Sequence, residues 1–232
     1  MIKRQVILDT ETTGLEPTKG HRLTEIGCLE MINRRLTGRR FQTYINPERE
    51  VDKGAVEVSG LTTEFLRDKP KFSEIVEEFL AFLREPNTEL IIHNASFDLG
   101  FLNHELGLLN HPWRPLENHL GVIDTLLMAR RLHPGQRNNL DALCARYKID
   151  NTHRQYHGAL LDSELLAKVY LAMTAGQTKM RLGTESIASE ATQPKINIQA
   201  VKRTQNSSLR VIRASEEECR IHEERMAAIR SA

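Results

Sequence analysis

The chain has 232 residues, which suits one domain of ordinary size with an appended segment. Its 40% hydrophobic and 27% charged residues, with a mean hydropathy of -0.43, are typical of a globular protein and argue against a disordered one. No apolar run approaches the roughly 18–20 residues of a membrane span. The net charge of +1 argues against a protein that coats nucleic acid through bulk electrostatics, but it allows one that grips a few nucleotides locally.

The apolar run near the first residue covers only positions 6–8, well short of the roughly 7–15 residues of a secretory signal. We therefore expect a cytoplasmic location. The three cysteines, Cys28, Cys144 and Cys219, show no C-x-x-C spacing and cannot all pair. They favour neither a disulfide framework nor a zinc ribbon.

The first part of the chain predicts strands. Positions 6–8 indicate a central strand that ends in polar residues, and positions 22–32 and 39–45 alternate well enough for a second and a third. A turn is expected at 34–38, and the Asn-Pro pair at 46–47 closes an antiparallel meander.

Helices and strands then alternate. Positions 72–85 place apolar residues on one helical face, and Pro86 ends this helix. The further expected elements are a strand at 90–92, a helix at 97–109, a strand at 122–123 that feeds a helix through 132, and helices at 140–147 and 159–173. This order predicts an α/β fold, a mixed sheet with helices on its faces.

The composition changes after position 176. Positions 183–208 are rich in Ser, Thr, Gln and Asn, with one Pro and no aromatic residue, which predicts a linker. Ser215 followed by Glu218 is typical of a capping box and predicts a terminal helix. The apolar stripe of that helix is too narrow to support a fold alone, so the segment is expected either to dock on a partner or to pack back on its own domain.

Two acids at the end of the first strand form the first candidate site. Side chains alternate across a strand, so Asp9 and Glu11 should point the same way while Thr10 points the other. Two carboxylates crowded at a buried strand end repel each other, and a proton, a base or a hard cation usually relieves that cost. The pair alone leaves open a strand that merely ends in polar residues.

Two further acids lie on helix faces that should be buried. Asp98 shares its stripe with Phe101 and Leu102, and Asp162 shares its stripe with Leu165. Both stand in the first turn of their expected helices, where the helix dipole favours negative charge, so each taken alone is also explained as a helix-starting residue. Helices normally keep charges off the face they bury, so all four acids together predict a functional site.

His157 stands five residues before Asp162, and inside one helix the two would lie about 140° apart. His157 is therefore expected in the loop before the helix, where Gly158 gives the chain freedom to aim the ring at a shared site. With its ordinary pKa near ~6.5, a histidine can take a proton from water at neutral pH.

These residues fall into a known pattern. The sequences DTETTG at 9–14 and NASFD at 94–98, followed by His157 and Asp162, resemble the three exonuclease motifs of the DnaQ-like, DEDDh 3′→5′ exonucleases. The resemblance covers positions 2–180 and includes NRRLTG at 33–38 and LDALCARY at 140–147. It implies a ribonuclease H-like fold.

The resemblance also implies a mechanism. In that family the four acids hold two divalent cations, Mg²⁺ or Mn²⁺, at the terminal phosphodiester of a single-stranded DNA 3′ end. Asp9 would bridge both cations, Glu11 and Asp162 would complete one site, and Asp98 would help to hold the second. His157 would act as general base, and the product would be a nucleoside 5′-monophosphate.

Substrate contacts follow from the same resemblance. The implied positions are Asp9, Glu11, Thr12, Gly54, Ser59 and Asp162. The chain departs from the family at two of them, because Ser59 stands where a histidine is common and Gly54 where a carboxylate is common. A serine can hydrogen-bond but neither stacks nor carries charge. Asp124 matches a strand-end acid of the family, and we expect it to cap its helix instead of binding metal.

The tail resembles that of family members that work with a polymerase. Positions 177–182, with Gln177, Met180 and Leu182, are similar to a short sliding-clamp-binding peptide. The expected organisation is an exonuclease domain at 1–180, a linker at 181–208 and, at 209–232, a segment that binds the alpha subunit of a replicative polymerase. Such a tether raises the effective concentration of the exonuclease at the primer end.

The leading hypothesis is a proofreading 3′→5′ exonuclease of a replicative DNA polymerase. An RNA 3′ exonuclease on the same fold would use the same metals and would not need the tail. A non-catalytic accessory module would bind the polymerase even without the four acids.

Overall fold

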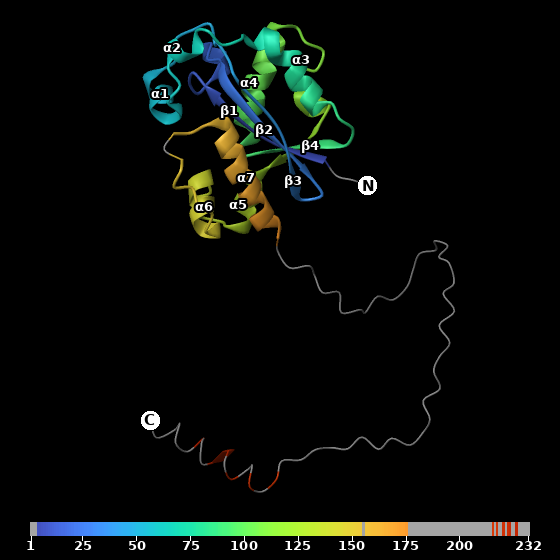
Figure 1. Cartoon of the computed structure of the whole chain (residues 1–232), viewed down its shortest axis with the longest axis vertical. Coiled ribbons are helices and arrows are strands. Elements are labelled where there is room, and N and C mark those ends of the chain that lie inside the picture. Colours follow the sequence, from blue (N-terminus) through green and yellow to red (C-terminus); the bar gives the residue numbers. More distant parts are fainter. Residues whose placement is uncertain are drawn as a thin grey trace, which may run out of the picture. The chain divides into compact units, whose positions relative to one another are not determined.

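The computed structural model describes residues 4–154 and 156–175 (Figure 1) and, beyond them, Ser215, Glu217, Arg220, His222, Glu223 and Met226. The chain divides into two compact units, Met1–Met180 and Arg181–Ala232, and each is described by itself. Within the described ranges, none of the helices combines the length and the apolar character that a membrane span needs.

A five-stranded mixed sheet organises the first unit. Its central strand is β1 (Arg4–Thr12), and the strand order is β3-β2-β1-β4-β5. The other strands are β2 (Leu23–Ile32), β3 (Arg35–Tyr44), β4 (Thr88–Ile92) and β5 (Gly121–Asp124). The first three strands form an antiparallel meander, whereas β4 runs parallel to β1 and β5 parallel to β4. This arrangement confirms the mixed α/β sheet that the sequence predicts.

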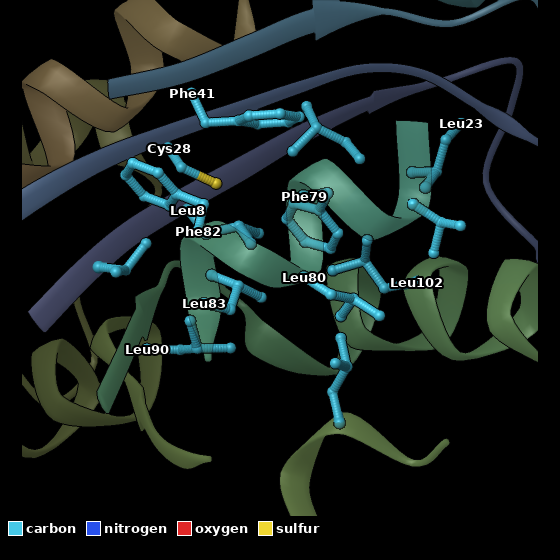
Figure 2. Packing of buried hydrophobic residues seen from close by; sticks show 14 of the residues in the cluster. Leu8, Leu23, Cys28, Phe41, Phe79, Leu80, Phe82, Leu83, Leu90 and Leu102 are labelled. Atoms are coloured by element: carbon cyan, nitrogen blue, oxygen red, sulfur yellow. The ribbon is translucent and has the colours of Figure 1, made fainter. Parts of the chain in front are cut away.

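One face of the sheet packs against two long helices. Val6 and Leu8 of β1 are fully buried there, with α3 (Phe72–Leu83) and α4 (Ala95–Leu108) on top of them. Figure 2 shows the apolar side chains of α3 inserted between the strands and α4. Phe79 of α3 has no exposed surface. This core fixes the position of α4 relative to the end of β1.

The opposite face carries three further helices, because alternate residues of a strand point to opposite sides. Ile7 of β1 packs there in a second core with α5 (Thr125–Leu132), α6 (Leu140–Tyr147) and α7 (Ala159–Thr174). In Figure 1, α7 lies across β1 and β2. The end of β1 therefore lies between the start of α4 on one face of the sheet and the start of α7 on the other.

The turn between β2 and β3 is shorter than predicted. It consists of Asn33 and Arg34, with φ angles of 48° and 66°, and β3 begins at the next residue. Two-residue hairpin turns with positive φ at both positions match the right-handed twist of the flanking strands. Gly38, which the sequence placed in the turn at 34–38, lies inside β3 with φ 85°, near a register shift between Leu29 and Met31 of β2.

Two short helices were not predicted. These are α1 (Lys53–Ser59) and α2 (Thr63–Leu66), separated by Gly60 with φ 72°. Thr62 caps α2 by accepting a hydrogen bond from the backbone of Phe65. Segments of one or two turns contain too few residues for helical periodicity to show.

Gly27 of β2 allows α7 to approach the sheet closely. A Cβ built there would lie 2.3 Å from the backbone atoms Ala159 C and Leu160 N. We expect Gly27→Ala to push the start of α7 away and to lower the free energy of unfolding by about 2–3 kcal/mol, measured by urea denaturation. Gly100→Ala is the control, because a Cβ at this helical position would meet no described atom within 4 Å apart from its chain neighbours and the nearby backbone of its own helix. It should stabilise the fold by about 0.5–1 kcal/mol, and an equal effect of the two substitutions would contradict the close-approach argument.

Most predictions beyond residue 175 fall outside the described residues. This applies to Gln177, Met180 and Leu182 and to the linker at 183–208. In the segment where a terminal helix is predicted, the helical positions described are Glu217, Arg220, His222, Glu223 and Met226, all of them exposed.

Candidate active site

The candidate site starts where β1 ends. The buried hydroxyl of Thr10 points to the α4 face and donates a hydrogen bond of 2.7 Å to Oδ1 of Asp98. Ile7 packs with residues of α7, so Asp9 and Glu11, two and four positions further along the strand, lie on that side. The two acids therefore share one face and Thr10 lies on the other, as predicted. Strand alternation therefore distributes three consecutive side chains between two helices.

Asp98 reaches the site because only His93 and Asn94 separate the end of β4 from the start of α4. Asn94 makes the sharp connection in a left-handed conformation, with φ 66°. Asp98 is 3% exposed and lies in the first turn of α4, as predicted. Asp124 supports this corner: its Oδ1 accepts hydrogen bonds from two backbone amides at the start of α5, and its Oδ2 accepts one from Ala95 N at the start of α4. The prediction that Asp124 caps its helix is confirmed.

Asp162 and His157 approach from the opposite face. Asp162 is 3% exposed in the first turn of α7, and His157 precedes that helix in a loop, as predicted. The backbone amide of His157 donates to the carbonyl of Val58 in α1, which holds the loop in place. Nδ1 of His157 lies 3.7 Å from Oδ2 of Asp162. One potential ligand atom each from Glu11, His157 and Asp162 lie within 4.8 Å of one another.

The carboxylates raise one another's proton affinity. Burial raises the pKa of Asp9 well above its ordinary value, and the negative charges of Asp98, Asp162 and Glu11 raise it further. Burial, reinforced by Asp162 and by Glu25, raises the pKa of Glu11 to about 8. Burial also raises the pKa of Asp98 to about 7, although the hydrogen bond from Thr10 opposes this. Such mutual repulsion is what a bound cation relieves.

The donor set fits hard divalent cations. Four carboxylates converge on the end of one strand, and oxygen ligands of this kind suit Mg²⁺ and Mn²⁺. The acids are crowded against one another in a partly desolvated corner, so a positive charge there gains more than it would in water. The histidine nitrogen beside them adds either a base or a further ligand.

A cleft of about 560 Å³ opens next to the cluster. Three of the positions for which substrate contacts are expected, Glu11, Thr12 and Gly54, line this cleft. Further lining residues are apolar and include Leu15, Val58 and Phe97. Leu15 and Val58 are 78% and 46% exposed, so the cleft has an exposed apolar wall.

Ser59 occupies a different position. It is buried, and its hydroxyl donates to the carbonyl of Ala55 and accepts from the amide of Leu61. It is not among the residues that line the cleft. The serine therefore closes the end of α1, and its contact with substrate stays a prediction without support from this geometry.

Sequence reasoning missed two charged residues of the site. Glu25 of β2 pairs directly with Glu11 across the sheet and is 2% exposed. Its Oε2 accepts from Ala159 N, the first residue of α7, and its Oε1 accepts from Gln42. An acid inside an apolar strand was a signal that could have identified it. The second residue, Arg154, lies in the loop before His157 and had no comparable signal.

Removal of metal should make the stability depend on pH. The acids with raised pKa, Glu11 at about 8 and Asp98 at about 7, bind protons more tightly in the folded chain than in the unfolded one. Their contribution is therefore fully present below about pH 4 and is lost as the pH rises towards 8. In EDTA we expect the free energy of unfolding to fall by about 1–3 kcal/mol between pH 5.5 and 8.5, and Mg²⁺ to restore most of it. Urea denaturation of the wild type and of Glu11→Gln checks this; a stability that rises with pH in EDTA would contradict it.

Comparison with known proteins shows the family of this chain. The exonuclease family of the RNase T type matches residues 6–170. Solved structures with the same fold include exonuclease I, with a TM-score of 0.66 and 16% identity over 75% of this chain and 41% of that one. Another is exonuclease X in complex with 5′ overhanging duplex DNA, with a TM-score of 0.56 and 23% identity over 74% of this chain and 91% of that one. Fold and acid cluster together define a metal-dependent 3′→5′ exonuclease with a ribonuclease H-like fold.

Closer relatives extend over nearly the whole chain. The DNA polymerase III subunit epsilon of Salmonella typhimurium is 50% identical over 229 residues, which cover 97% of this chain and 93% of the relative. The subunit of the same name from Escherichia coli is 48% identical over the same shares of both chains. The chain therefore belongs to the exonuclease family and, within it, to the DNA polymerase III epsilon subunits.

Proposed function

We propose that this chain proofreads for a replicative DNA polymerase by removing mispaired 3′-terminal nucleotides as 5′-monophosphates. The observation that carries the proposal is the convergence of Asp9, Glu11, Asp98 and Asp162 beside a cleft with an exposed apolar wall. Relatives of nearly equal length that are named DNA polymerase III subunit epsilon support the assignment to a polymerase.

Asp9, Glu11 and Asp162 would hold one divalent cation, and Asp9 with Asp98 would help to hold a second. Mg²⁺ and Mn²⁺ both suit this oxygen set. When bound, such cations stabilise the attacking and leaving oxygens of an in-line phosphoryl displacement. Thr10 orients Asp98 through its hydroxyl, and Glu25 anchors the start of α7, so that both helix acids meet those of β1.

His157 is the proposed general base for the attacking water. Burial and the nearby charge of Arg154 lower the pKa of His157, so the ring is neutral and able to accept a proton at pH 7. Its side chain is 42% exposed, which leaves room for water and substrate. The backbone hydrogen bond to Val58 ties the base to the wall of the cleft.

The cleft would take the terminal nucleotide of a single strand. Leu15, Val58 and Phe97 offer apolar surface for a base, whereas Thr12 and Gly54 lie where backbone or sugar could approach. A mispaired end frays more readily than a paired one, so entry into a single-strand site costs less and mismatches are removed preferentially.

The polymerase partnership would use the chain beyond the exonuclease unit. We propose that Gln177, Met180 and Leu182 contact a sliding clamp and that 209–232 binds the alpha subunit of the polymerase, with 181–208 as the linker. Support comes from the sequence pattern and from relatives whose match includes this region. A cytoplasmic location follows from the same proposal.

One assay tests the proposed activity and its substrate together. The purified chain with Mg²⁺ is given labelled primer-templates with a matched or a mismatched 3′ end, and single strands of DNA and of RNA with the same sequence. We expect faster release of 5′-monophosphates from the mismatched primer and from DNA. Preference for RNA would instead support an RNA exonuclease, and an inactive chain that still co-purifies with the polymerase would support an accessory module.

A further inference from the structure

Arg154 connects three groups at the edge of the acid cluster. Its Nε donates to Oδ1 of Asp162 at 2.5 Å, and its Nη2 donates to Oδ2 of the same carboxylate at 2.6 Å. The same Nη2 lies 3.0 Å from Nδ1 of His157, and Nη1 donates to Asp141 at 2.7 Å. The arginine and Asp162 side chains are only 7% and 5% exposed, so water screens this ion pair little.

These contacts occupy atoms that the proposed metal site and the proposed general base would use. A guanidinium has hydrogen-bond donors and no acceptor, so Nδ1 of His157 must accept from Arg154 and the proton of the neutral ring must lie on Nε2. The acceptor nitrogen that faces Asp162 is therefore engaged, as are both oxygens of Asp162. A divalent cation at Asp162 would lie next to the positive charge of Arg154.

We propose that Arg154 is a built-in counter-ion that competes with the divalent cation for Asp162 and occupies Nδ1 of His157. The inference rests on the metal site of the proposed function. Loading of the site then requires the guanidinium to withdraw from Asp162, and Asp141, whose side chain is 52% exposed at the start of α6, provides an anchor outside the cluster. Arg154 is a positioning residue: it neutralises the crowded acids until the cation replaces it.

The test is Mn²⁺ binding to the full chain without DNA, measured by isothermal titration calorimetry. We expect Arg154→Ala to bind Mn²⁺ about tenfold or more tightly than the wild type, because both the competing donor and the repelling charge are gone. In EDTA the same variant should unfold at a lower temperature than the wild type, and Mn²⁺ should raise that temperature by a larger interval. A purely structural role predicts the opposite change in affinity, because a disordered Asp162 binds metal less well.

Two further variants keep the result interpretable. Lys168→Ala removes an exposed cation from α7 without touching the acids and should leave the Mn²⁺ affinity within about twofold. Arg154→Lys keeps the positive charge but loses the planar guanidinium that donates two hydrogen bonds to Asp162, so it should bind Mn²⁺ with intermediate affinity. It replaces the alanine variant if that variant does not fold. Equal or weaker binding in the folded Arg154 variants overturns the inference. A wild type that binds no Mn²⁺ overturns the proposed metal site itself.

Discussion

Asp9→Asn should abolish nearly all nuclease activity while making the metal-free fold more stable. The negative charges of the three other acids, Asp98, Asp162 and Glu11, all repel the charge of Asp9. In the proposed site Asp9 would help to hold both cations. Loss of that carboxylate should lower the rate on the order of 10³-fold or more, about 4 kcal/mol of transition-state stabilisation. In EDTA, removal of one repelling charge should raise the unfolding temperature by about 3–6 °C.

The rate is measured as single-turnover release of the 3′ nucleotide, and the unfolding temperature by circular dichroism in EDTA. Glu164→Gln is the matched control, since it removes one carboxylate from α7 outside the cluster and should change neither quantity appreciably. Activity of Asp9→Asn within about tenfold of the wild type would refute the proposed metal site. A large loss of stability in EDTA would show instead that the carboxylate is structural.

His157→Gln should lower the single-turnover rate by about 10²–10³-fold without a matching loss of metal binding. The rate should fall without a loss of metal affinity, because the proposed role of the ring is to take a proton from water and not to bind metal. In the wild type, kcat/KM should fall at acid pH because the ring becomes protonated. The midpoint of this fall should lie below the ordinary pKa of a histidine, because burial and the charge of Arg154 lower the pKa of His157. The variant should lack that acid limb.

The Mn²⁺ affinity of the His157→Gln variant decides between two roles for the ring. Because Glu11, His157 and Asp162 could hold an ion together, a loss of Mn²⁺ affinity parallel to the loss of rate would identify His157 as a metal ligand. Unchanged affinity with the rate lost supports the general base. His153→Gln, an exposed histidine of the same loop, is the control and should behave as the wild type.

Much of this architecture follows from local patterns. The period of two in β1 separates Asp9 and Glu11 from Thr10, and the period of 3.6 puts Asp98 and Asp162 on buried helix faces; both patterns appear within a few residues of sequence. The position of His157 before α7 follows from its spacing to Asp162. The fold class follows from the same periodic patterns, whereas the membership in the exonuclease family was predicted from the resemblance of the motifs at 9–14 and 94–98, with His157 and Asp162, to that family.

Other features leave no signal in the sequence that shows their role. Glu25 matters because it pairs with Glu11 in the sheet and accepts from Ala159, 134 residues further on. Ser59 is not among the residues that line the cleft, because its hydroxyl makes hydrogen bonds at the end of α1. This helix is too short for a periodic signal in the sequence. The hairpin at Asn33 and Arg34 is set by the twist of its strands, so a turn-forming composition around Gly38 misplaced it.

The sequence by itself therefore determined the kind of chemistry, because residue types and short periodicities specify which acids can share a face. Tertiary structure decided which further charged residues lie next to those acids. Glu25 lies opposite Glu11 through the strand register and accepts a hydrogen bond from Ala159 of α7. Arg154 is near Asp162 and His157 in the sequence, but the loop that brings the three together is tied to Val58 of α1 through the backbone amide of His157. Such contacts leave no local pattern in the sequence, because they depend on how strands and helices pack in the whole fold and not on neighbouring residues alone.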